Sequence, residues 1–112
     1  MISETTTVLD REQLREVTFE DEDLMRVLVA ALIEDTEKQI PLFHRAIETS
    51  DGAECARLAH YCKGACSNVG AKATASVLQK LERSGVAGLM DDCGQQLRVL
   101  GIELERLRAE KL

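Results

Sequence analysis

The residues best suited to chemistry lie in one short segment, ARLAHYCKGACSNVGA at residues 56–71, which holds one of the chain's two histidines. His60 is followed at i+3 by Lys63 and at i+4 by Gly64. A neutral imidazole leaves one ring nitrogen free as a nucleophile, and an ammonium one turn away attracts phosphoryl oxygens. Glycine in mid-helix costs about 1 kcal/mol relative to alanine. We therefore expect Gly64 to give access to His60.

Helical register predicts that His60 points away from the protein core. With Cys55 at zero and about 100° per residue, the apolar positions fall within about 80° of that direction. This predicted core stripe comprises Leu58, Ala59, Cys62, Ala65, Cys66 and Val69. On the same wheel His60 lies at about 140°, Ser67 at about 120° and Gly64 at about 180°. A glycine opposite the core stripe is poorly placed for a helix–helix contact.

Turn and capping signals divide the chain into five predicted helices. They cover residues 8–17, 19–51, 52–69, 71–83 and about 88 to the C-terminal region. Asp51 with Glu54 resembles a capping box that starts the third helix, and Gly70 supplies a left-handed C-terminal residue. The fourth helix is expected to end at Ser84-Gly85. Pro41 predicts a kink or a break near residues 37–40 of the second helix.

Apolar spacing indicates how these helices associate. The positions expected to face inward are Leu9, Leu14 and Val17 in the first helix, Leu28, Leu32, Ile40, Phe43 and Ile47 in the second, and Met90, Cys93, Leu97, Leu100, Leu104 and Leu107 in the last. Short connections make successive long helices antiparallel neighbours. The predicted fold is all-α, an up-down antiparallel four-helix bundle with a short N-terminal helix. We expect one domain over 1–112, with an N-terminal segment at 1–19 and the bundle at 20–112.

Composition narrows the possible functions. The chain has 112 residues, 45% hydrophobic and 3% aromatic, and a formal net charge of -6. No basic patch is visible in the sequence, which argues against nucleic acid and anionic membranes as partners. The N-terminus lacks the features of a signal peptide, and the apolar run at 27–33 is too short to span a bilayer. We expect a cytoplasmic protein with four reduced cysteines.

At this point the residues resemble a known family. His60-x-x-Lys63-Gly64, followed by Asn68-Val69-Gly70-Ala71, closely resembles the signature of histidine-containing phosphotransfer (HPt) domains. The helical pattern on both sides also fits, so the resemblance covers nearly the whole chain. One departure is Cys62, where the family commonly has leucine. Because register places Cys62 in the core, this change concerns packing.

The resemblance implies a phosphoryl-carrying intermediary in a multistep phosphorelay of a two-component system. His60 would be the phospho-acceptor, Lys63 would offset phosphoryl charge, and Gly64 would admit the partner. Arg57 and Ser67 border the histidine face as candidate partner contacts. The implied partners are receiver domains of a hybrid histidine kinase and a response regulator, which would supply the aspartate and Mg²⁺. We expect a monomer that binds no cofactor itself.

The chain also lacks a glycine-rich nucleotide loop, a Walker-type lysine and a carboxylate cluster near His60. We therefore expect no ATP site and no enzymatic activity of its own. A related alternative is the phosphoacceptor domain of a chemotaxis-type histidine kinase, which shares the bundle and the motif. The absence of kinase machinery favours a free-standing phosphotransfer protein or an excised domain.

Two alternatives come from other classes. One is a non-catalytic helical adaptor that binds a partner through the same face and tolerates loss of His60. The other is a thiol or metal protein, because Cys62 and Cys66 lie at i, i+4 on the same face as Cys55. Zinc sites usually combine short-spaced cysteine pairs or ligands from two elements, so we favour core packing for these thiols and no metal. His44, without a following lysine and glycine, is expected to be an ordinary surface residue.

Overall fold

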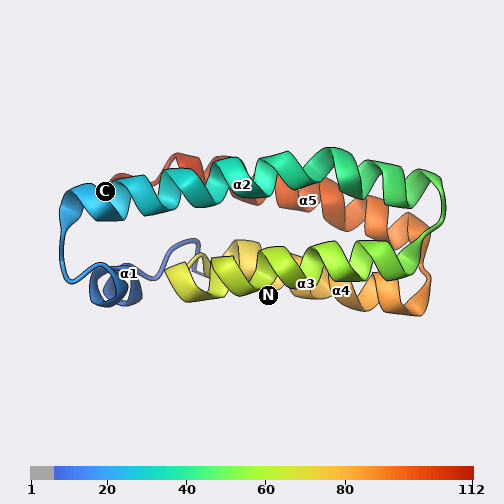
Figure 1. Ribbon diagram of the computed structural model, residues 1–112, viewed down its shortest axis with the longest axis horizontal. Coiled ribbons are helices and arrows are strands. Elements are labelled where there is room, and N and C mark those ends of the chain that lie inside the picture. The colour runs from blue at the N-terminus through green and yellow to red at the C-terminus, as the bar shows by residue number, and fades with distance from the viewer. Residues whose placement is uncertain (1–6) are drawn as a thin grey trace.

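The chain folds into a bundle of antiparallel helices. The computed structural model describes residues 7–112; residues 1–6 of the predicted N-terminal segment lie outside the described part. Its helices are α1 (Arg11–Val17), α2 (Glu22–Glu48), α3 (Gly52–Val69), α4 (Lys72–Ala87) and α5 (Met90–Arg108). Figure 1 shows α2 and α3 side by side with α5 and α4 behind them, and α1 across one end. The predicted all-α four-helix bundle with a short N-terminal helix is confirmed.

Aspartate caps set the starts of three helices. Asp51 accepts a hydrogen bond from the backbone N–H of Glu54 at 3.0 Å, as the capping signal predicted. The reciprocal half of the box is absent, because the Glu54 carboxylate instead accepts from Arg57 at 2.6 and 2.8 Å. Asp10 and Asp21 cap α1 and α2 in the same way. Each cap satisfies one of the otherwise unpaired N–H groups of the first helical turn.

The second helix differs from its prediction at its start and near Pro41. It begins at Glu22, not at residue 19, because Phe19 and Glu20 have φ angles of 53° and 62° in the preceding loop. No break occurs near Pro41: this exposed proline lies within a continuous helix. Fully buried Phe43, two residues later, keeps this stretch packed on the core. Tertiary packing therefore outweighs the local cost of proline.

The predicted end of the fourth helix is also wrong. The α4 helix continues through Ser84-Gly85 to Ala87, and Gly88, with φ of 73°, ends it. Gly85 instead allows α4 to approach α3: a Cβ there would lie 2.7 Å from the carbonyl oxygen of Gly52 and 2.8 Å from the nitrogen of Ala56. Gly85 is therefore a contact residue inside a helix. The sequence pattern alone does not distinguish such a glycine from one that ends a helix.

Most of the predicted core is confirmed, although two predicted positions are exposed and four are only half-buried against the core: Leu28, Ile40, Ile47 and Met90. The inward-facing leucines of α5 and the apolar stripe of α3 are buried. Ala65, however, is exposed, because it lies at the edge of a stripe narrower than predicted. In α1, Val17 is 45% exposed and Thr18 is buried in its place, where its hydroxyl donates to the carbonyl of Leu14 at 2.7 Å.

All four cysteines are buried free thiols. Burial raises the pKa of Cys55 and Cys66 to about 11 and that of Cys62 to about 12. Thiols of this kind are poor nucleophiles and behave as small apolar side chains. This supports the core-packing interpretation over the thiol one. None of the helices within residues 7–112 is long and apolar enough to cross a bilayer.

The glycine contact predicts a sharp difference between two substitutions. Gly85→Ala would force its Cβ against backbone atoms of α3, and we expect a loss of about 1–3 kcal/mol in the free energy of unfolding. Gly101→Ala in α5 meets no atom within 4 Å and should stabilise by about 0.5–1 kcal/mol. Urea unfolding at equilibrium measures both. Equal effects of the two substitutions would contradict close packing at Gly85.

Candidate functional site

His60 lies on the outward face of α3, as helical register predicted. Its side chain is 72% exposed. One turn further on, a Cβ added to Gly64 would meet no atom within 4 Å. The space over Gly64 is therefore open, and the alternative of a helix–helix contact at this glycine is excluded. The imidazole therefore lies next to Gly64, which has no side chain, on a surface that another protein can reach.

Glu82 of α4 joins His60 and Lys63 into one cluster. Its Oε2 lies 3.2 Å from Nδ1 of His60, and its Oε1 accepts a hydrogen bond from Nζ of Lys63 at 2.8 Å. Glu82 is not among the site residues predicted from the sequence, although a signal for it exists. The α3–α4 turn centres on Ala71, and His60 and Glu82 each lie eleven residues from it. In an antiparallel helical hairpin, residues equally distant from the turn lie opposite one another.

The charge of Glu82 determines which nitrogen of His60 carries the proton. The hydrogen bond from Lys63 lowers the pKa of Glu82, which outweighs the opposing effect of partial burial. The positive charge of Lys63 and the nearby His60 lower it further. An ionised carboxylate only accepts hydrogen bonds, so Nδ1–H must be the donor. In the neutral imidazole, Nε2 then has the free lone pair.

Lys63 is much less exposed than His60. Its side chain is 23% exposed, and its ammonium is held on the same carboxylate that contacts His60. An ammonium has three donors, so the bond to Glu82 leaves two for an incoming anion. Arg57 is exposed but engaged by Glu54.

The C-terminal end of α3 is anchored by the segment around α1. Gly70 ends α3 with φ of 95°, as predicted, and its carbonyl accepts from the N–H of Asp10 at 2.8 Å. The amide of Gln13 donates to the carbonyls of Ser67 and Asn68 at 2.6 and 3.1 Å. These bonds satisfy carbonyls that a helix end leaves unpaired. Gln13 is not among the residues predicted from the sequence, because no sequence motif indicates this contact with the end of α3. Ser67 itself lies on the exposed face of α3.

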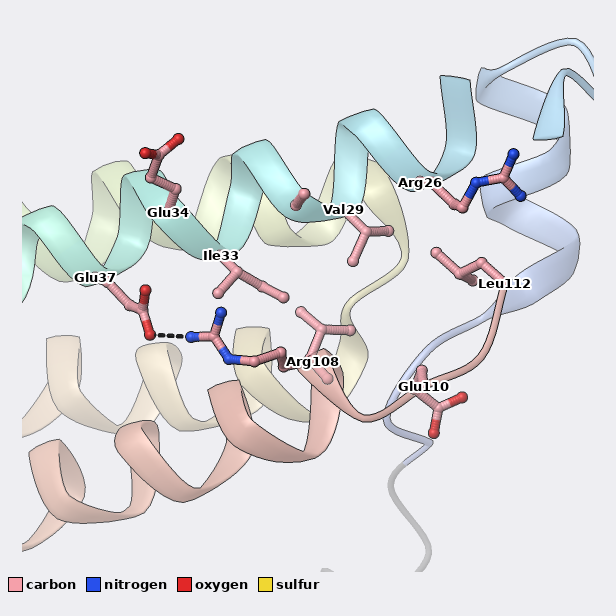
Figure 2. A pocket seen from close by; sticks show the side chains of 10 residues that line it. Arg26, Val29, Ile33, Glu34, Glu37, Arg108, Glu110 and Leu112 are labelled. Carbon is pink, nitrogen blue, oxygen red and sulfur yellow. Dashed lines mark hydrogen bonds and ion pairs between the residues drawn. The ribbon is translucent and has the colours of Figure 1, made fainter. Parts of the chain in front are cut away.

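The other side of the bundle offers a groove without comparable chemistry. A hollow of about 500 Å³ lies between α2 and the end of α5. Figure 2 shows Val29 and Ile33 pointing into it from α2. Its Arg108 is paired with Glu37 across the hollow. His44 lines a neighbouring groove with Ile40. No residue of α3 or α4 lines either groove.

Metal coordination finds no support in the described structure. Within residues 7–112, no three His, Cys, Asp or Glu side chains are grouped to hold an ion. Glu82 is the carboxylate in contact with His60, and Lys63 already neutralises it.

Comparisons with known proteins agree with this geometry. The family model of the Hpt domain matches residues 27–110. Sensor histidine kinase AruS of Pseudomonas aeruginosa is 31% identical over 83 residues, which cover 74% of this chain and 8% of the kinase. The chain thus spans less than a tenth of that relative's length.

A solved structure extends the likeness to the whole fold. The crystal structure of histidine-containing phosphotransfer protein B (HptB) from Pseudomonas aeruginosa PAO1 superposes with a TM-score of 0.81 and 27% sequence identity. The match covers 90% of this chain and 88% of HptB. Together with the family match over three quarters of the sequence, these findings establish the family predicted from the histidine motif. The chain belongs to the Hpt domain family.

Proposed function

We propose that His60 carries a phosphoryl group between receiver-domain aspartates in a two-component phosphorelay. One observation carries the proposal: an exposed imidazole has its Nδ1 against an ionised carboxylate, which directs the lone pair of Nε2 to solvent beside Gly64. A structural histidine would be buried or paired through both nitrogens. A nucleophilic one needs an accessible nitrogen with a defined protonation state.

In the proposed step, Nε2 of His60 attacks the phosphorus of an aspartyl phosphate on the partner. The new N–P bond forms in line as the P–O bond to the aspartate breaks, and the aspartate leaves as a carboxylate. No proton has to leave Nε2. The ring becomes an imidazolium whose charge is offset through Nδ1–H by Glu82. The reverse sequence returns the group to a second receiver.

In the proposal, Lys63 and the receiver domain both stabilise the negative charge of the phosphoryl oxygens. The ammonium of Lys63 lies on the carboxylate that holds His60, within the same cluster, and donates toward phosphoryl oxygens. The receiver domain contributes the aspartate and Mg²⁺. This chain contributes no nucleotide site in the proposal, so it acts as a carrier and not as a kinase.

The partner must dock over the exposed part of α3 around His60 and Gly64. Beside His60, Tyr61 is 56% exposed and its hydroxyl donates to Asp35 of α2 at 3.4 Å. Further along α2, Leu24 and Val27 are also exposed. An exposed tyrosine beside an open histidine, with further exposed apolar side chains on α2, suits a protein partner. We therefore assign docking to α3 together with the exposed side of α2, in the cytoplasm where receivers operate.

Replacement of the acceptor gives the primary test. His60→Gln should abolish transfer of labelled phosphate from a phosphorylated receiver domain of the source organism. The control His44→Gln should transfer at the wild-type rate, because His44 lies on the α2–α5 side. The label should be acid-labile and alkali-stable. A folded wild-type protein that accepts no phosphate from any receiver would instead favour the adaptor hypothesis.

Glu82 should control the rate and the tautomer. In Glu82→Gln, the charge that orients Nδ1–H and offsets the imidazolium is lost, so we expect transfer to slow roughly 10-fold or more. The ¹⁵N spectrum of His60 should shift from a dominant Nδ1–H form towards a mixture. In the unsubstituted protein, the Glu82 carboxyl should titrate at a pKa below that of an ordinary glutamate, and Lys63→Met should raise it. Unchanged rate and spectrum would exclude this role.

The access of a receiver domain over Gly64 can be tested separately from the reactivity of His60. Gly64→Leu should preserve the fold, because the site is open, yet its side chain would obstruct a docked receiver. We expect transfer from a phosphorylated receiver to fall more than about 10-fold. Phosphorylation by the small donor phosphoramidate should continue at a similar rate. The matched control Gly101→Leu, also in open space, should affect neither reaction. Equal loss with both donors would contradict the access role.

A further inference from the structure

A groove between α3 and α4 opens directly beside the His60 cluster. Its volume is about 430 Å³. Its lining includes the cations Lys63, Lys72, Lys80 and Arg83, together with Ser76 and Gln79. Lys63 belongs both to this groove and to the Glu82 cluster. The groove therefore starts about one helical turn from the imidazole and runs towards the Gly70 turn.

The four cations are not equivalent. Lys63 is paired with Glu82 at 2.8 Å and Lys72 with Asp10 at 3.3 Å. Lys80 and Arg83 are exposed, one turn apart on α4, and neither forms an ion pair within residues 7–112. Like charges at i, i+3 repel each other. An anion bound between them would relieve that repulsion.

Positive charge is concentrated on this part of an otherwise acidic protein. Residues 52–87, which form α3 and α4, contain five Lys or Arg and two Asp or Glu. The rest of the chain contains nine Lys or Arg and eighteen Asp or Glu, and the whole carries -6. A local field of opposite sign to the net charge steers and orients partners. Here four of these five cations line the groove beside His60.

Any protein that reaches His60 must also cover the start of this groove. Arg83 follows Glu82 in sequence, and Lys80, although turned about 200° from Glu82 around α4, lines the same groove as Lys63. A stable interface buries about 800 Å² on each partner, an area far larger than one helical turn. Lys80 and Arg83 therefore fall within the footprint of a protein docked on the imidazole.

We infer that the α3–α4 groove receives an acidic surface segment of the receiver domain that exchanges phosphate with His60. This inference rests on the proposed function and adds a determinant of partner choice: receivers with carboxylates beside the phosphorylation site bind, and those with cations there are repelled. Nucleic acid fits less well, because the groove is short and the remaining chain is strongly acidic.

Matched charge reversals test the inference. K80E/R83E and the control R98E/K111E change the net charge equally, each by reversing one exposed lysine and one exposed arginine, but the control sites lie in α5 and the C-terminal residues. The donors are receiver domains of the source organism phosphorylated with acetyl phosphate. At low ionic strength, K80E/R83E should lower kcat/KM at least about 10-fold, chiefly through KM, and the control less than about twofold. At roughly 0.5 M salt the difference should shrink.

Each other outcome has a defined meaning. Equal losses in the two variants, or a loss independent of salt, would overturn the inference and leave the proposed function intact. Phosphoramidate should label His60 in K80E/R83E at the wild-type rate, which separates docking from damage to the acceptor. If no receiver labels the unsubstituted protein while phosphoramidate does, both proposals fail. If single-stranded DNA binds the wild type and not K80E/R83E, the groove belongs to a nucleic acid.

Discussion

The close approach of α3 and α4 is the constraint on which the site depends. Gly52 and Gly85 let the two helices meet backbone to backbone at one end, and the turn at Gly70 joins them at the other. A helical pair fixed at both ends cannot slide, so the register between His60 and Glu82 is set. A shift of one residue would turn Glu82 by about 100° around α4. The carboxylate would then no longer reach both the imidazole and Lys63.

This arrangement explains why the sequence predicts His60, the proposed nucleophile, more easily than Glu82. His60, Lys63 and Gly64 lie within one helical turn and a half, so local periodicity is enough to place them on one exposed face. Glu82 is brought in by the packing of α4, and its role follows only once the hairpin register is known. The cations of the groove were likewise dispersed along the sequence, and no basic patch was visible before α3 and α4 were placed together.

The errors in the predicted elements have the same origin. Gly85 was interpreted as a helix end because glycine often ends helices, yet its small size serves contact with α3. Ala65 and Val17 are exposed, although the apolar pattern predicts both in the core. Each of these depends on what the neighbouring helix contributes. By contrast, the caps Asp51 and Gly70 were predicted correctly, because a cap is satisfied by its own few residues.

The charges of Lys63 and Glu82 suit a proposed carrier that must release its phosphoryl group as well as accept it. At rest, the charge of Lys63 is offset by Glu82, which also lies against His60. A fully free lysine beside the imidazole would bind the phosphoryl group more strongly and raise the barrier to its departure. In the proposed transfer, Glu82 would stabilise the imidazolium of the phosphorylated ring and would weaken the hold of Lys63 on the phosphoryl oxygens. These two effects oppose each other, which would allow transfer in either direction.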